Sequence, residues 1–187
     1  PIVGQADEPW EPYALHVLSS VLDGGESARL SRELVRGRGI AASAGAEYGS
    51  YSRLPGMFLL DGTPTDGHTV AEVEQALREA VATLREELIA PDELKRVVTQ
   101  AVASKVYQAD SLFYQAMEIG VLETIGLDWR LIDKEIEALK AVTPEQVRTV
   151  ARRYLVDENL TVATLKPLPM DKKSARPAAQ AGGRHGS

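Results

Sequence analysis

The sequence predicts an α+β domain, in which an antiparallel-dominated sheet of few strands carries about seven helices packed mainly on one face. Three short stretches have the character of strands, at 40–49, 57–62 and 159–165. Stretches with helical periodicity lie before, between and after them. Runs of helices between blocks of strands are typical of this fold class.

The first predicted helix begins near Pro12, a residue suited to the first turn of a helix. The stretch 22–48 then combines the end of this helix, a Gly-Gly turn, a short basic helix, a second glycine-bearing turn and a strand. The strand part is small and apolar, which suits close packing of another element against it. A turn at 50–56 joins it to the second strand.

The clearest helix is predicted at 69–88, because apolar residues recur there at intervals of three and four with charges between them. Pro91 starts the next helix, and further helices are expected at 111–125 and 128–140. Thr143 and Gln146 have the spacing of a capping box for a last helix at 144–155.

The 187-residue chain has the length of one domain with a tail, and its 44% hydrophobic and 26% charged residues are an ordinary soluble globular composition. The net charge is −6, made of −9 in the expected domain 1–166 and +3 in the tail 167–187. An acidic body argues against nucleic acid as a partner, and no apolar run approaches the ~20 residues of a membrane span. The absence of cysteine excludes disulfides and thiolate metal sites. The tail is rich in Pro, Ala, Gly and basic residues, and we expect it to be disordered.

Several motifs resemble the second-domain signature of the pitrilysin/insulinase and mitochondrial processing peptidase family of zinc metallopeptidases. That signature has a glycine-rich turn, then Ser-Arg-Leu, then Leu-Arg-Glu-Lys-Arg-Gly-Leu-Ala-Tyr. The matching pieces here are 24–25, 27–30 and 34–42, followed in the family's order by 109–111, 143–147, 153–155 and 159–163. The resemblance covers roughly residues 9 to 167, and it identifies the chain as similar to the C-terminal, inactive domain of such a peptidase.

The resemblance implies half of a clamshell subunit, whose sheet has one more strand. That strand would precede Pro1, so the domain 1–166 either lacks it or holds part of it in 1–5. The family's first domain carries a zinc motif, His-x-x-Glu-His, in which the Glu activates water. The chain has only His16, His68 and His185, none spaced as ligands on one helical face. We therefore expect no metal and no cofactor in this chain, and zinc in the parent protein or its partner.

The family's second domain also carries an arginine, followed seven residues later by a tyrosine, which stabilises charge on the scissile carbonyl oxygen. Matching residue by residue puts Val35 at the arginine position and Ala42 at the tyrosine position. Neither side chain can donate a hydrogen bond, so we expect no catalytic residue in this chain.

Four arginines form a basic patch on the acidic body, and the small strand follows them. The candidate contacts to substrate or partner are Arg29, Arg32, Arg36, Arg38, Ala41 and Ser43. The alternative for the arginines is a solvated helix face that pairs with nearby glutamates.

The expected function is that of a non-catalytic domain providing chamber wall, peptide-substrate surface and assembly contacts in a zinc metalloendopeptidase subunit. The alternative is a structural scaffold homologue without proteolytic activity, and the sequence leaves open which of the two applies. The implied partners are an N-terminal peptidase domain of the same protein, a homologous subunit and unfolded peptide. The resemblance favours the bacterial periplasm, with any targeting segment upstream of Pro1.

Overall fold

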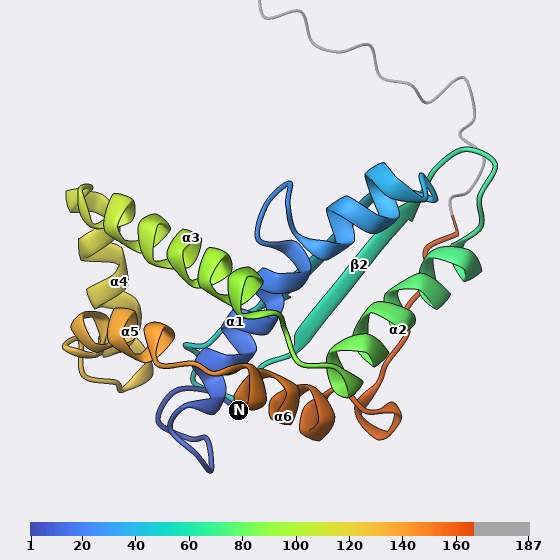
Figure 1. Cartoon of the computed structure of the whole chain (residues 1–187). Helices are drawn as coiled ribbons and strands as arrows, with labels where there is room; N and C mark the ends of the chain where they lie inside the picture. The colour runs from blue at the N-terminus through green and yellow to red at the C-terminus, as the bar shows by residue number, and fades with distance from the viewer. Residues whose placement is uncertain (167–187) are drawn as a thin grey trace, which may run out of the picture.

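The computed structural model describes residues 1–166, and within them it confirms the α+β class (Figure 1). Six α-helices and one π-helix accompany one antiparallel pair of strands. In chain order the elements are α1 (Glu11–Asp23), η1 (Ser31–Gly37), β1 (Ala41–Tyr48), β2 (Phe58–Pro64), α2 (Val70–Glu86), α3 (Pro91–Ala109), α4 (Leu112–Ile125), α5 (Leu131–Lys140), α6 (Pro144–Tyr154) and the 3-10 turn η2 (Asp157–Asn159). The predicted tail at 167–187 lies outside the described residues.

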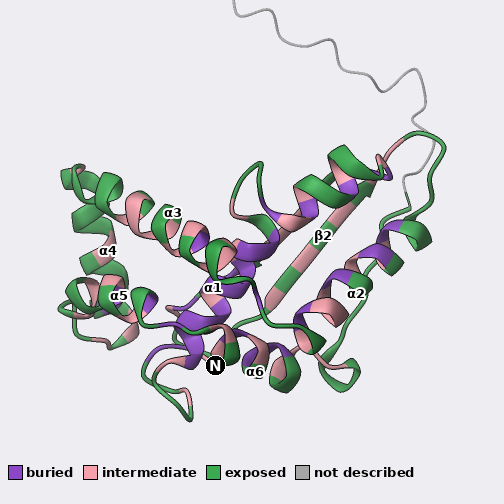
Figure 2. Ribbon diagram, in the orientation of Figure 1, coloured by how far each residue is buried: buried purple, intermediate pink, exposed green. Residues whose placement is uncertain are grey.

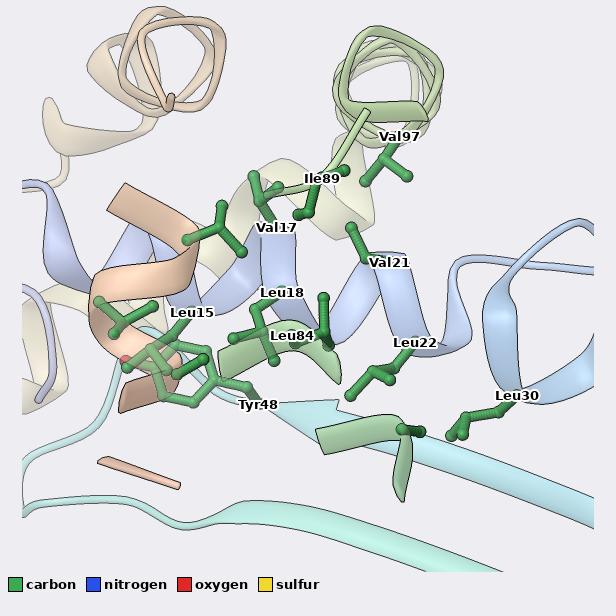
Figure 3. Packing of buried hydrophobic residues seen from close by; sticks show 14 of the residues in the cluster. Leu15, Val17, Leu18, Val21, Leu22, Leu30, Tyr48, Leu84, Ile89 and Val97 are labelled. Carbon is green, nitrogen blue, oxygen red and sulfur yellow. The ribbon is translucent and has the colours of Figure 1, made fainter. Parts of the chain in front are cut away.

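Helix α1 forms the centre of the core, and ten of its thirteen residues are buried. It packs against β1, α3, α5 and α6. Val17 and Val21 point to one side, toward the start of α3, while Leu15, Leu18 and Leu22 point to the other side, where β1 and α2 pass (Figure 3). A helix that is packed on opposite sides needs apolar residues on both of them, which explains the broad apolar pattern of α1.

Helices cover one face of the β1–β2 ladder and leave the other face open. The strands pair along their length, with a bulge between Ala41 and Ser43. Half-buried side chains on the covered face are Ala44, Ala46, Phe58 and Leu60. A Cβ atom added to Gly62 would lie 2.6 Å from Cγ1 of Val73, so the close approach of α2 requires a glycine there.

Capping boxes fix the starts of α2 and α6. The Thr143 amide donates to Oε1 of Gln146 over 3.0 Å, and the Gln146 amide donates to the Thr143 hydroxyl over 3.2 Å, which confirms the predicted capping box of α6. Thr69 and Glu72 form a second capping box at the start of α2. The hydrogen bonds from Thr69 lower the pKa of Glu72 below its usual value.

Helices α3, α4 and α5 form an arm on one side of α1, away from the sheet (Figure 1). α3 and α5 contact α1 directly, whereas α4 has its main contacts with α3. Leu122 is the one buried residue of α4. Most of that helix is exposed, as Figure 2 shows.

The prediction of a closing strand at 159–165 was wrong. Residues 157–159 form η2, and the chain from Leu160 to Lys166 is exposed and has no regular secondary structure. Within residues 1–166 this stretch pairs with no strand. A strand exists only through its ladder, so a sequence with strand composition stays unpaired where a partner is missing.

Candidate functional site

The segment that carries the resemblance, η1 followed by β1, contains a π-helical turn. The Arg38 amide donates to the Glu33 carbonyl, five residues back, over 2.7 Å. A Cβ atom on Gly37 would lie 2.9 Å from the Arg32 carbonyl oxygen, so this turn needs a glycine. Gly39 then takes a φ of +66°, which turns the chain into β1. π-helical turns are rare and often occur at functional sites, so this turn is a reasonable place to look for one.

The two positions that the resemblance assigns to the arginine and the tyrosine differ in their surroundings. Val35 is half-buried and packs against the hydrophobic core. Ala42 is exposed and lies at the bulge of β1. A larger side chain at Ala42 would meet solvent, whereas one at Val35 would have to leave a packing position.

Arg29 is engaged within the domain. Its Nε and Nη2 atoms donate to the two carboxylate oxygens of Glu93 on α3, over 3.0 and 2.7 Å. Both side chains are largely shielded from solvent. This bidentate pair lowers the pKa of Glu93, since Arg29 stabilises the charged carboxylate. The pair therefore ties the chain just before η1 to the start of α3.

The other three arginines are exposed, and each also has an internal partner. Arg32 pairs with Glu33 over 2.6 Å, and Arg38 pairs with Glu79 of α2 over 3.1 Å. Arg36 donates to the backbone carbonyl of Glu26. Exposed ion pairs contribute little to stability, so these guanidinium groups can exchange their partners for others at small cost.

The two predicted contact positions on the strand are not equivalent. Ala41 is buried in the core, whereas Ser43 is exposed. Ser43 lies opposite Thr63 on the open face of the sheet, which has small and polar side chains near it. The remaining open-face pairs are Gly45 with Asp61 and Glu47 with Leu59.

A buried ionic cluster that the sequence analysis missed lies between α3, α4 and α5. Lys105 Nζ is 2.9 Å from Oε2 of Glu135 and 2.9 Å from Oε1 of Glu118. The Glu135 side chain is only 3% exposed. The Tyr51 hydroxyl is buried nearby without a hydrogen bond of good geometry, although it lies close to Glu135 and Tyr13.

Burial and the charges of this cluster favour the uncharged forms of two neighbouring side chains, Tyr51 and His16. Burial, followed by the charge of Glu135, raises the pKa of Tyr51. Burial lowers the pKa of His16, and the nearby Lys105 acts in the same direction while Glu135 opposes it. The pKa of Lys105 is raised, because its two carboxylate partners outweigh its desolvation. The cluster thus holds one ammonium between two carboxylates, an arrangement that joins helices.

The sequence did contain a signal for this cluster. Lys105 lies eight residues after Val97 and four after Ala101, within the apolar stripe of α3. Glu135 lies midway between Leu131 and Leu139 on α5. A charged residue in each of two apolar stripes indicates a buried pair.

The described residues show neither a metal cluster nor a membrane span. Within 1–166 no three His, Cys, Asp or Glu side chains gather in a way that could hold a metal ion. No helix in that range is long and apolar enough to cross a membrane. His16 lies on α1 and His68 lies before α2, beside Glu72, while His185 lies outside the described range.

Curated relatives include two bacterial proteins named as zinc proteases. The uncharacterized zinc protease YmxG of Bacillus subtilis is 28% identical over 155 residues, which are 83% of this chain and 37% of the relative. An uncharacterized zinc protease of Streptomyces coelicolor is 27% identical over 165 residues, covering 88% of this chain and 35% of the relative. The chain thus spans just over a third of the length of these relatives.

Solved structures share the fold. A protease from Helicobacter pylori superposes with a TM-score of 0.75 at 18% identity, over 85% of this chain and 37% of that one. The inactive peptidase domain of a Bordetella parapertussis protein, described as a candidate zinc protease, superposes with a TM-score of 0.74 at 20% identity. That match covers 90% of this chain and 89% of the Bordetella chain.

A family model described as the peptidase M16 inactive domain matches residues 2–101, more than half of the chain. The match contains α1, η1, β1 and β2, so it includes the segment on which the resemblance to the zinc metallopeptidases rests. That resemblance is confirmed, and the chain belongs to the peptidase M16 inactive-domain family.

Proposed function

We propose that this chain is the non-catalytic domain of a zinc metalloendopeptidase subunit and forms part of the wall of a chamber that holds unfolded peptide. The open face of the β1–β2 ladder is the observation that carries this proposal. Small or polar side chains make up most of it, with Ser43 and Thr63 at one end and the exposed Leu59 near the other. Such a face leaves room for an extended chain, whereas the opposite face is taken up by α1 and α2.

The exposed arginines support a contact role next to that wall. Arg32, Arg36 and Arg38 lie on and just after η1, which leads directly into β1. They form a local cluster of positive charge on a domain whose net charge over residues 1–166 is −9. An acidic group of a peptide or of a partner subunit would replace their weak exposed partners. Arg29 is excluded from this role, because Glu93 holds it.

Zinc would be bound elsewhere, by an N-terminal peptidase domain or a homologous subunit. The names of the curated relatives support zinc in the parent protein. In the resembled family the zinc motif and the arginine–tyrosine pair can lie on separate subunits. Val35 and Ala42 occupy the positions of that pair here, so we propose that another domain supplies it.

One further strand completes the sheet in this proposal, and it would lie before Pro1, because residues 1–5 form a turn and not part of a strand. The Tyr48 hydroxyl donates to the Pro1 carbonyl, so a preceding segment would start at that end of the ladder. β2 pairs only with β1 among residues 1–166, and Leu160 and Val162 are half exposed on an unpaired stretch. Hydrogen exchange tests this: amides of 58–64 and 160–165 should exchange more slowly in a polypeptide extended before Pro1. Unchanged exchange in both segments would contradict it.

The test of the proposed function compares the 187-residue chain with the longer polypeptide and its partner subunit, on a quenched unfolded peptide. We expect the assembly to hydrolyse the peptide, to stop with a chelator and to recover with zinc. The chain alone should hold no stoichiometric zinc and give no turnover. A failure of every assembly to cleave would instead favour the scaffold function.

The same assay tests whether another domain supplies the donor pair. The double variant Val35→Arg/Ala42→Tyr should leave the rate of the assembly within a fewfold, because one pair already serves each zinc site. A gain of roughly 10²–10³-fold, the scale of one oxyanion donor, would show that this domain faces the zinc itself. Val35→Arg/Ala42→Phe is the matched control, since it keeps the ring and removes the hydroxyl donor.

A further inference from the structure

Helix α4 exposes an apolar surface that its own domain does not cover. Leu112 and Phe113 are 82% and 73% exposed, and Tyr107 at the end of α3 is 76% exposed. Together with Tyr114, Met117 and Val121, which are each about half exposed, these side chains define the α3–α4 surface. Figure 2 shows how little of α4 is buried. A helix that is apolar on all sides is normally enclosed by other elements, so this surface lacks its covering in the described residues.

The α3–α4 surface carries almost no charge. α4 contains no lysine or arginine, and one of its two glutamates, Glu118, is paired with Lys105. Helices that lie on membranes have basic residues on their polar face, which α4 does not have. Contact with a lipid surface is therefore disfavoured, and a protein surface of matching apolar character is the better partner.

A hollow of about 510 Å³ borders this surface, between α3 and α4, and Gln100, Ser104, Tyr107 and Tyr114 are among its lining residues. A second hollow of about 300 Å³ continues from it toward α1, through the shared Gln100 and Ser104. There it is lined by His16 and Ser20 of α1 and by Gly24, which directly follows the helix. The two hollows together form an open groove along α3, and a depression between packed helices is a place where a further helix can pack.

We propose that the α3–α4 surface and its groove dock an apolar helix from the part of the longer polypeptide that lies outside this chain. This inference rests on the proposed function, which places the chain in such a polypeptide. The match to YmxG covers 83% of this chain but only 37% of the relative, so relatives of this kind have ample additional sequence to cover the surface. A second copy is less suitable, because it would bring another body with a net charge of −9.

Thiol labelling tests this, because the chain has no cysteine of its own. Ala116→Cys places one thiol on the exposed side of α4 and keeps every large side chain of the α3–α4 surface. Asp157→Cys is the control, since the Asp157 side chain is 88% exposed and belongs to η2. In the 187-residue chain both thiols should react with a water-soluble disulfide reagent at similar rates.

In the longer polypeptide the thiol at 116 should react at least about tenfold more slowly, which corresponds to about 1.4 kcal/mol, while the thiol at 157 is unaffected. Adding Phe113→Ser should restore fast labelling of the thiol at 116. This comparison is made between two variants of the longer polypeptide, so it does not need the 187-residue chain as a reference. Equal labelling in both polypeptides would overturn the proposal. Protection in the 187-residue chain that rises with its concentration, together with a dimer in sedimentation, would overturn it in favour of a second copy. The readout is independent of zinc and cleavage, so a protected thiol in an inactive polypeptide would overturn only the proposed function.

Discussion

Lys105→Met should lower the free energy of unfolding by about 3–5 kcal/mol, because it leaves the Glu135 carboxylate buried without its cation. Glu135 is 3% exposed and Lys105 Nζ lies 2.9 Å from it. Glu118 can turn toward solvent when the lysine is lost, since its side chain is 27% exposed, but Glu135 cannot. Urea denaturation at neutral pH measures the loss, with an unchanged m-value as evidence that the same surface is exposed on unfolding.

The matched control removes both charges. Lys105→Met/Glu135→Leu should recover most of the stability or exceed it, because well-packed apolar residues often replace a buried ion pair without loss. A double variant as unstable as Lys105→Met alone would mean that the loss of stability comes from the packing of the aliphatic parts of Lys105 and Glu135, and not from the unpaired charge. The pair joins α3 to α5, so it also holds the base of the arm that bears the α3–α4 surface.

Elements defined by local sequence were predictable. The spacing of apolar residues identified α2, and the Thr143–Gln146 capping box set the start of α6. The glycine turns at 24–25 and 39 correctly separated α1, η1 and β1. These features depend on residues within a few positions of one another, so a single sequence contains the information.

Features that depend on distant partners were not predictable in the same way. The stretch 159–165 has strand composition but pairs with no strand in the described residues, and the sequence shows only the composition. The π-helical form of η1 likewise depends on which carbonyl the Arg38 amide reaches. Pairings across the fold are set by packing, which local patterns do not encode.

The same limit applies to the candidate site. Residue types suggested a basic patch, but only the fold shows that Arg29 is held by Glu93 while Arg32, Arg36 and Arg38 stay exposed. Ala41 and Ser43 were equivalent in sequence, and the bulge of β1 places one in the core and the other on the open face. A strand alternates its faces, so a bulge shifts which residues are open to contact.

The central position of α1 leads to the second large effect. Leu18→Ala should lower the free energy of unfolding by about 3–5 kcal/mol, the upper part of the range for a buried leucine. Leu18 is fully buried, and α1 is packed from opposite sides by α3 and by the sheet and α2 (Figure 3). A helix held on both sides cannot move into the cavity, so little of the lost packing is regained.

The matched control is Leu54→Ala in the turn between the strands, where the leucine is 70% exposed and the change should stay within about 0.5 kcal/mol. Equilibrium unfolding in urea measures both variants under the same conditions. A loss below about 1 kcal/mol for Leu18→Ala would mean that α1 can shift to fill the space. Because α1 leads through the Gly24-Gly25 turn into η1 and β1, such freedom would also undermine a fixed wall on the open face of the sheet.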